Sequence, residues 1–201
     1  MSQSRTAAKK YMSNGIERLL QIIVETSFRT SDVPTYPLAS GLLSKYYVDC
    51  KIALSYPEAR ELIGELIIDQ IGSTAIDAVG GQELGAYPIA VAVSDAFYRR
   101  DKKTIRAFVV RKKPKTHGLK KHLEGDVREG DRVLIVDDVI TSGKSTADAI
   151  KKSREEGLCV IRAIGIIDRQ EVNGANTIED CEVPFNALLS LQNLIDLKGQ
   201  A

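Results

Sequence analysis

The stretch VLIVDDVITSGKST, residues 133–146, passes from an apolar run through two acids into a loop of small and hydroxyl-bearing residues. The run from Val133 to Val136 has no polar position, which predicts a strand that is buried on both faces. Asp137 and Asp138 follow directly. We expect both carboxylates to emerge at the carboxyl edge of this strand, because ionised groups are costly inside an apolar layer.

The loop after the two acids has the composition of an anion site, and it opens an expected helix. Free N–H groups at a helix N-terminus, the positive end of the helix dipole and nearby hydroxyls together bind a phosphate monoester. Carboxylates beside such a loop can accept hydrogen bonds from sugar hydroxyls, so the pattern indicates a sugar phosphate. The alternative is a capped helix after a buried strand, with Asp138 merely solvated. The loop residues are Thr141, Ser142, Gly143, Lys144 and Ser145.

The tripeptide Gly143-Lys144-Ser145 imitates the end of the P-loop pattern GxxxxGK[ST] of nucleoside triphosphatases. The first glycine of that pattern would fall on Asp138. A carboxylate at this position would repel a polyphosphate, so we reject this class of enzyme.

On both sides of 133–146, apolar strands alternate with helices, which predicts an α/β fold with a central, mainly parallel sheet flanked by helices. Ligands of such sheets bind at the carboxyl ends of the strands. A small hairpin is expected over 34–54, a polar turn region over 172–180, and a closing strand and short helix over 186–197. The other expected strands are 75–81, 104–110, 132–139 and 158–168, and the expected helices are 13–28, 57–67, 87–99 and 144–156, the last with Ala147, Ile150 and Lys151 on adjacent turns.

The composition of the chain limits the classes of protein to which it can belong. It has 201 residues, 28 Lys and Arg against 27 Asp and Glu, and a net charge of +1. Near-neutral charge argues against binding of nucleic acid or a membrane surface through bulk charge. No segment reaches the roughly 20 apolar residues that a membrane-spanning helix needs. Three widely spaced cysteines without a CxxC pattern predict free thiols in a cytoplasmic protein, with Cys159 packed in the core.

A second distinctive stretch, RKKPKTHGLKKHLEG at 111–125, is strongly basic. Pro114 and Gly118 disfavour regular structure, and like charges this dense repel one another unless an anion is present. We expect a loop that orders over a polyanion; a solvated basic loop is the alternative. The adjacent lysines Lys151 and Lys152, in the expected 144–156 helix, are expected to be solvated surface. The cations and histidines of the basic stretch are Arg111, Lys112, Lys113, Lys115, His117, Lys120, Lys121 and His122.

Five separated segments resemble one enzyme family. Residues 133–146 resemble the phosphoribosyl pyrophosphate motif of type I phosphoribosyltransferases, and AFVVRKKPKTHG with the following EG resembles the catalytic loop of orotate phosphoribosyltransferases. VGGQELGAYPIA (79–90), LASGLLSKYYVD (38–49) and IIDRQE (166–171) resemble further motifs of that family, in the same order. The resemblance implies the type I phosphoribosyltransferase fold in a single domain, 1–201, with a helix and hairpin hood over about 1–55 and an α/β core over about 56–201.

The resemblance also implies an activity: transfer of ribose 5-phosphate from phosphoribosyl pyrophosphate to N1 of orotate, giving orotidine 5'-monophosphate and pyrophosphate in pyrimidine biosynthesis. Mg²⁺, held mainly by the substrate with no protein metal ligands, would assist the departing diphosphate. A homodimer with shared active sites is implied, because in this family the part of the loop that carries Lys115 and His117 closes the neighbouring subunit's site.

Site roles follow from the same resemblance. Asp137 and Asp138 would hold the ribose hydroxyls, and the stretch Thr141 to Ser145 would cradle the 5'-phosphate. Arg169 would meet orotate, since a planar guanidinium suits a planar anionic pyrimidine, with Thr141 and Tyr47 beside the base. The implied catalytic residues are Lys115, His117, Asp137 and Asp138; the implied pyrophosphate contacts are Arg111, Lys112, Lys115 and His117; Gly81 and Gly85 bracket the loop that pyrophosphate approaches.

Two positions depart from the family pattern. Some members carry lysines where this chain has Ala39 and Leu84. Either this branch does without those cations, or Lys45, Lys113 or Lys120 substitutes.

Two rival functions stay open at this point. One is a non-catalytic regulator that senses phosphoribosyl pyrophosphate and binds nucleic acid, which would need a basic face or an appended DNA-binding element. The other is a phosphoribosyltransferase for another base, such as a purine. Arg169 and the YYVD segment (46–49) favour an acidic pyrimidine.

Overall fold

The computed structural model describes residues 2–38, 41–113, 122–170 and 174–200, with the side chains of the first helix described from Asn14 onward. At its centre lies a six-stranded sheet in the order β10-β9-β8-β5-β6-β7, in which only β7 runs antiparallel to its neighbour. This confirms the predicted mainly parallel sheet. The strands are β5 (Ala78–Gln82), β6 (Arg106–Val110), β7 (Leu123–Glu124), β8 (Arg132–Ile140), β9 (Cys159–Asp168) and β10 (Phe185–Ser190).

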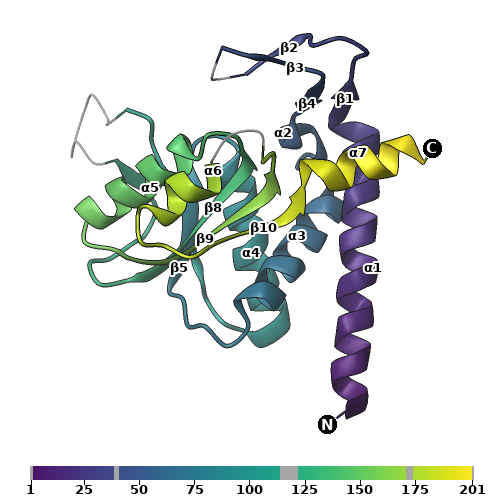
Figure 1. Ribbon diagram of the computed structural model, residues 1–201. Coiled ribbons are helices and arrows are strands. Elements are labelled where there is room, and N and C mark those ends of the chain that lie inside the picture. Colours follow the sequence, from purple (N-terminus) through teal and green to yellow (C-terminus); the bar gives the residue numbers. More distant parts are fainter. Residues whose placement is uncertain (1, 39–40, 114–121, 171–173, 201) are drawn as a thin grey trace.

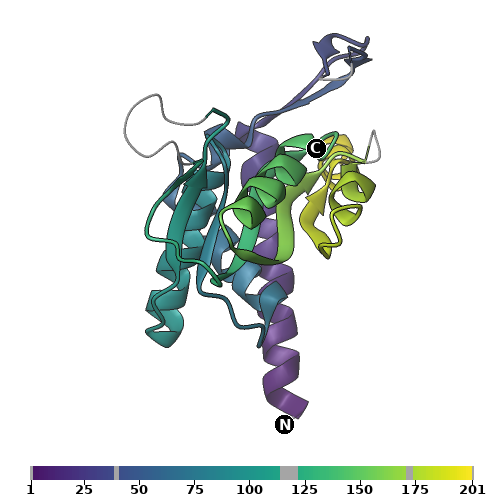
Figure 2. The same cartoon turned by 90° about the vertical axis from the view of Figure 1, so that its left-hand side faces the viewer.

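Helices cover both faces of this sheet (Figures 1 and 2). Helices α3 and α4 pack on one face, with α1 outside α3 and α7 beside α1, whereas α5 and α6 pack on the other face. The N-terminal part of α1 extends past the body of the molecule (Figure 1). The helices are α1 (Ser2–Thr26), α2 (Cys50–Ala53), α3 (Pro57–Ile71), α4 (Ala86–Asp101), α5 (Lys144–Glu155), α6 (Gly174–Glu179) and α7 (Leu191–Gly199).

Strand β8 shows why its apolar run predicted a doubly covered strand. Successive side chains of a strand point to opposite faces. Val133 and Ile135 belong to the core cluster under α5, whereas Leu134 and Val136 belong to the cluster under α3 and α4. All four side chains are fully buried. The strand therefore joins the two halves of the core, and the two acids near its carboxyl end, Asp137 and Asp138, are held by a rigid element.

A small hood stands over the carboxyl edge of the sheet (Figure 1). Two antiparallel strand pairs form it: β1 (Phe28–Thr30) with β4 (Tyr46–Val48), and β2 (Tyr36–Pro37) with β3 (Leu43–Ser44). The rings of Tyr36 and Tyr47 stack with centroids 5.5 Å apart. The expected hairpin within 34–54 is thus confirmed, and β4 ties it to the end of α1 through β1.

Several sequence-based expectations were wrong in detail. The first helix was expected over 13–28 but runs from Ser2 to Thr26, because Phe28 already pairs in β1. Residues 172–180 contain the helix α6 rather than only turns. Cys159 is exposed, because it is the first residue of β9 at the amino edge of the sheet.

Helix α5 was expected over 144–156 and runs from Lys144 to Glu155, with Lys151 on its solvent side as expected. The buried residues of this helix are Thr146, Ala149, Ile150 and Ser153, and Lys151 is exposed. The cysteines are free, as expected. No helix in the described part of the chain is long and apolar enough to cross a membrane.

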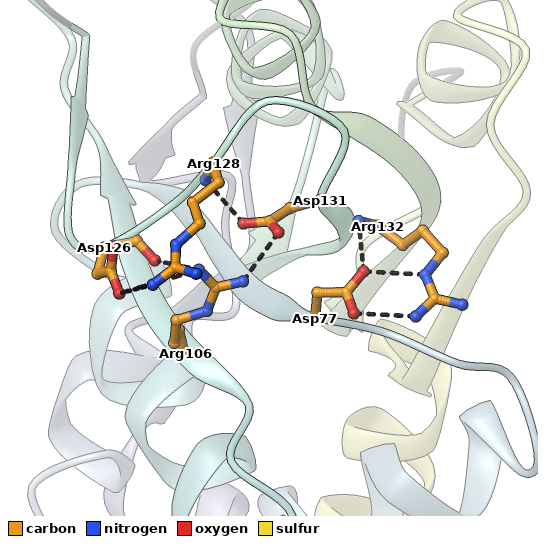
Figure 3. A network of polar contacts seen from close by, with 6 residues as sticks. All are labelled: Asp77, Arg106, Asp126, Arg128, Asp131 and Arg132. Atoms are coloured by element: carbon orange, nitrogen blue, oxygen red, sulfur yellow. Dashed lines mark hydrogen bonds and ion pairs between the residues drawn. The ribbon is translucent and has the colours of Figure 1, made fainter.

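Ion pairs fasten the amino edge of the sheet, where strands β5, β6 and β8 begin (Figure 3). The guanidinium of Arg132 donates to both oxygens of Asp77 at 2.9 Å, and its backbone N–H donates to the same carboxylate at 2.9 Å. Arg106 donates to Asp131 at 2.8 Å, and the backbone N–H of Arg128 donates to the other oxygen of Asp131 at 2.7 Å. These contacts join the segments that enter β5, β6 and β8.

Asp77→Asn is expected to destabilise the protein at neutral pH by about 1 kcal/mol, a value that allows for partial solvent exposure. Hydrogen bonds from Arg132 lower the pKa of Asp77 to about 2. Because the folded-state pKa lies below the unfolded one, this stabilisation is present above about pH 4 and is lost as the pH falls toward 2. Urea unfolding at several pH values checks this. A wild-type advantage that stays constant down to acid pH would contradict it.

Candidate functional site

The candidate site lies where the order of the strands reverses. Strands β5 and β8 are neighbours, but the chain leaves β5 toward β6 on one side and β8 toward β9 on the other. Such a switch point opens a crevice beyond the carboxyl ends of the two strands. A cavity of about 350 Å³ lies there. Its lining residues are Lys51, Gln82, Glu83, Leu84, Gly85, Lys112, Asp137, Asp138, Val139 and Ser145.

Asp137 is more enclosed than the sequence suggested. It was expected to emerge at the strand edge, but it is only 6% exposed. One oxygen accepts hydrogen bonds from the hydroxyls of Ser145 at 2.9 Å and Thr146 at 2.7 Å, and the other accepts from the backbone N–H of Asp138 at 3.0 Å. The first turn of α5 thus folds over this carboxylate and supplies two of its hydrogen-bond donors.

Burial and the charge of Asp138 raise the pKa of Asp137 to about 6, although the hydrogen bonds from Thr146 and Ser145 oppose the shift. Desolvation disfavours the charged form of an acid, so the larger of the two causes is the enclosure itself. The ionised form of Asp137 is therefore disfavoured by its surroundings. This buried carboxylate lies next to a second one, Asp138, which faces the cavity.

Asp138 is the more accessible acid of the pair. Its side chain is 16% exposed, and one oxygen accepts from the backbone N–H of Val139 at 3.0 Å. The other oxygen lies 3.8 Å from Nζ of Lys51. Gly85 leaves room for it, because a Cβ built on Gly85 would collide with the Asp138 carboxylate. The glycine at this position is therefore required by the acid on the neighbouring strand.

The loop between β8 and α5 has the geometry of an anion cradle. Gly143 is the N-cap of α5, with φ at +68°, and a Cβ there would collide with the carbonyl oxygen of Gly174. Glycine adopts this left-handed conformation without strain. It brings no side chain that could cap the first N–H groups of α5. Thr141 and Ser142 are partly buried in the loop, and Lys144 and Ser145 are exposed at the start of the helix.

Arg169 connects the core to the hood. It follows β9 directly, is only 6% exposed, and donates from Nη2 to the carbonyl oxygen of Tyr46 at 2.9 Å and to Oγ of Ser44 at 3.2 Å. Tyr47 is 43% exposed and stacks on Tyr36. Neither Arg169 nor Tyr47 lines the cavity at the acids. Arg169 lies where the hood meets the sheet edge.

The root of the basic loop lies against the cavity. Lys112 is one of the lining residues, and its backbone N–H donates to Glu83 at 2.8 Å. Arg111 is directed elsewhere, with Nη1 3.6 Å from Glu124 and Nε donating to the carbonyl oxygen of Lys113. Lys115 and His117 lie outside the described residues, so their assigned roles remain predictions.

Lys51 is a cavity residue that the sequence reasoning missed. Its Nζ lies 2.7 Å from Asp49 and 3.8 Å from Asp138. Burial lowers the pKa of this ammonium group, but the hydrogen bond to Asp49 and the charge of Asp138 outweigh that effect and raise it above its ordinary value. The signal in the sequence was Asp49, which caps α2 and so places Lys51 in its first turn, next to the hood.

Lys51 also bears on the two departures from the family pattern. Leu84 lies at the cavity with its side chain 70% exposed, and Ala39 lies outside the described residues. Of the expected substitutes, Lys45 and Lys113 are exposed and do not line the cavity, and Lys120 is outside the described part. Lys51 and Lys112 supply the positive charge of the described lining.

The residues fit a divalent cation only in part. Within the described ranges no group of three or more His, Cys, Asp or Glu side chains could hold a metal ion. Both oxygens of Asp137 already accept hydrogen bonds, which leaves Asp138 and Glu83 as the carboxylates of the described lining that are open toward the cavity. A cation here would therefore take most of its oxygen ligands from a bound diphosphate.

Comparison with known proteins gives a consistent result. The model of the phosphoribosyl transferase domain matches residues 52–183. The chain is 40% identical to the orotate phosphoribosyltransferase of Aquifex aeolicus over 179 residues, which are 89% of this chain and 97% of that protein. It is 44% identical to the orotate phosphoribosyltransferase of Methanocaldococcus jannaschii over 67% of this chain and 72% of that one.

Solved structures of orotate phosphoribosyltransferases resemble this chain as well. The orotate phosphoribosyltransferase of Mycobacterium tuberculosis H37Rv in complex with Fe(III) dicitrate superimposes with a TM-score of 0.77 at 32% identity, covering 90% of this chain and 98% of that one. Its complex with 5-phospho-alpha-D-ribosyl 1-diphosphate superimposes with a TM-score of 0.71 at 28% identity, covering 90% and 92%. The strand order, the acids and the glycine-capped loop are thus found in a chain that is similar to these enzymes over nearly its whole length.

Proposed function

This chain belongs to the orotate phosphoribosyltransferases of the phosphoribosyl transferase family, and from that premise we propose how its residues perform the reaction. The reaction transfers ribose 5-phosphate from phosphoribosyl pyrophosphate to N1 of orotate and releases pyrophosphate. The observation that carries the assignment of roles is the pairing of two carboxylates with a glycine-capped helix N-terminus at the switch point between β5 and β8.

The two halves of this site suit the two parts of the donor. The N–H groups that open α5 and the hydroxyls of Thr141, Ser142 and Ser145 would bind the 5'-phosphate, with the charge of Lys144 nearby. Asp138, open to the cavity, would accept hydrogen bonds from the ribose hydroxyls. Asp137 would act mainly as a support for this site and less as a direct ligand of the ribose, since its oxygens already hold the first turn of α5 in place.

The transfer needs management of charge more than a protein nucleophile. Displacement at the anomeric carbon develops positive charge on the ribose ring and negative charge on the leaving diphosphate. Asp137 and Asp138 would stabilise the first charge, and Lys51 and Lys112 at the cavity would stabilise the second. A bound Mg²⁺ would supply further neutralisation of the diphosphate. Closure of the basic loop would exclude water and so protect the donor from hydrolysis.

Recognition of orotate is assigned to the hood side of the site. Arg169 would present its guanidinium to the orotate carboxylate while it holds the hood through Ser44 and the Tyr46 carbonyl. Thr141 and Tyr47 would flank the base. This assignment makes 1–55 and 56–201 parts of one functional domain, because the residues that meet the base come from both.

The remaining assignments extend this proposal. Lys115 and His117 would reach the diphosphate of a neighbouring subunit, which makes the protein a homodimer with shared active sites. A biosynthetic enzyme with free cysteines fits the cytoplasm. Its partners would be orotate and phosphoribosyl pyrophosphate, with no nucleic acid and no membrane.

The direct test mixes purified protein with Mg²⁺, phosphoribosyl pyrophosphate and orotate, and follows the loss of orotate absorbance. Uracil, hypoxanthine and adenine serve as parallel acceptors. We expect turnover of orotate alone. Turnover of a purine alone would favour a different base, and binding of the donor without any turnover would favour the regulator.

Lys51→Ala is expected to raise the KM for phosphoribosyl pyrophosphate by about tenfold, because the cavity loses one of its two described cations. The KM for orotate should change by less than about twofold, since Lys51 lies at the acids and not at the hood contact of Arg169. Initial rates with each substrate varied in turn measure both values. Lys45→Ala, an exposed lysine outside the cavity, is the matched control; an equal effect of both changes would contradict the role of Lys51.

A further inference from the structure

Lys152, on the third turn of α5, is not the solvated surface residue that the sequence suggested. Its side chain is only 12% exposed, whereas that of its neighbour Lys151 is 77% exposed. Nζ of Lys152 donates to the backbone carbonyl oxygens of Arg111 and Lys112, each at 3.1 Å. A lysine is rarely enclosed to this degree unless its charge is partnered. Here its partners are the main chain of the root of the basic loop.

A second residue of α5 orients that lysine. Asp148, one turn before Lys152, lies 2.7 Å from Nζ. The same oxygen of Asp148 accepts a hydrogen bond from Nε2 of Gln82 at 2.8 Å. Gln82 is the last residue of β5 and lines the cavity. Gln82, Asp148 and Lys152, named the loop-root clasp here, therefore join the carboxyl ends of β5 and β6 to the helix that carries the phosphate cradle.

The clasp acts on the main chain next to the cavity, since Lys112 is one of the lining residues. Besides accepting from Lys152, Lys112 donates its backbone N–H to Glu83, which is also a cavity residue. The backbone N–H of Arg111 donates to the carbonyl oxygen of His122, the residue directly before β7. The main chain at 111–112 is thus held from two sides, and hydrogen bonds that involve a charged group are the stronger kind.

We propose that the loop-root clasp is a positioning device. It holds the main chain of Arg111 and Lys112 in the position that is needed to bind the diphosphate of the donor. Lys152 does not reach the cavity; it acts through the residues that it holds. This inference rests on the proposed function, because the diphosphate is the ligand to be met. Misplacement of a binding group by an ångström can reduce a rate by orders of magnitude.

The first test compares Lys152→Gln with Lys151→Gln, a change on the same helix at an exposed position. Lys152→Gln should raise the KM for phosphoribosyl pyrophosphate, and for pyrophosphate in the reverse direction, by roughly tenfold. The KM for orotate should change by less than about twofold, and Lys151→Gln should change neither. Lys152→Arg, which keeps a cation with several donors, should recover part of the loss. A merely structural lysine would instead raise both substrate constants together with a fall in Tm.

The second test does not depend on activity. Hydrogen exchange of the backbone amides of Arg111 and Lys112 should become at least about tenfold faster in Lys152→Gln, while amides in the centre of β8 keep their wild-type rates. Asp148→Asn, which leaves the lysine in place but removes its orienting charge, should shift the same amides and serves if Lys152→Gln folds poorly. Unchanged exchange at both amides, or an unchanged KM for the donor, would overturn the proposal. If the unmodified protein did not turn over orotate, the proposed function would fall, but the exchange comparison would still decide the clasp.

Discussion

Asp137→Asn is expected to make the protein more stable at about pH 7.5 while it lowers kcat/KM by about 100-fold. The pKa of Asp137 is raised to about 6, chiefly by burial, so its charge opposes folding above that pH. An asparagine of the same shape can accept from the Asp138 N–H and donate to the hydroxyls of Ser145 and Thr146, because hydroxyls both donate and accept. It carries no charge to bury.

The sign of the pH dependence follows from linkage. The folded-state pKa of Asp137 lies above the ordinary value, so the folded state binds more protons between about pH 4 and pH 6. The contribution of this group to stability is therefore greatest at low pH and declines as the pH rises through that window. Relative to the wild type, Asp137→Asn should gain about 1–2 kcal/mol between pH 5 and pH 7.5.

Urea unfolding of both proteins at the two pH values measures this gain, and initial rates measure the loss of activity. Asp138→Asn is the matched control, since that carboxylate is more open to solvent: it should lose activity to a similar extent without a comparable gain in stability. If Asp137→Asn were less stable than the wild type at the higher pH, the hydroxyl contacts would outweigh desolvation, and our account of the buried carboxylate would be wrong.

Arg169→Ala is expected to lower kcat/KM for orotate by about 100-fold or more. The variant removes the guanidinium proposed to meet the orotate carboxylate, and it also removes two contacts that hold the hood, to Ser44 and to the Tyr46 carbonyl. Because the side chain is buried, the free energy of unfolding should also fall by about 1–3 kcal/mol.

Two further variants separate recognition of orotate from support of the hood. Ser44→Ala removes one hood contact and keeps the guanidinium, so it should change the KM for orotate by less than about threefold. Arg169→Lys keeps a positive charge but lacks the planar fork, and it should still lose most of the activity toward orotate. An Arg169→Lys protein with the wild-type KM for orotate would show that Arg169 serves the hood alone.

The sheet was predictable because its signals are local. The apolar run of β8 is covered on both faces, and Pro57 opens α3 at its first position, as expected. The site motif could equally be recognised, since the two acids lie near the carboxyl end of β8 and the glycine-capped loop follows that strand directly. Each of these predictions depends on residues that are neighbours in the chain.

What the sequence could not reveal depends on contacts between distant segments. The enclosure of Asp137 requires the hydroxyl of Thr146 to turn back over β8. The role of Lys152 requires α5 to lie beside residues 111–112, some forty positions earlier. Lys51 meets Asp138 only once α2 packs at the end of β8. Lys51 and Lys152 have the sequence context of ordinary surface residues, and only the folded chain brings them to their partners.

The amino edge of the sheet carries the stabilising ion pairs of Asp77, Arg132, Arg106 and Asp131 (Figure 3), whereas Asp137 and Asp138 lie near the opposite end of β8. An engineer could therefore rebuild that rim for tolerance to heat or fuse another protein near it, and leave the chemistry at the far rim untouched. Laboratory selection for thermal stability and selection for a new acceptor base would act on separate sets of codons. Improvements in the two properties should therefore combine in one gene.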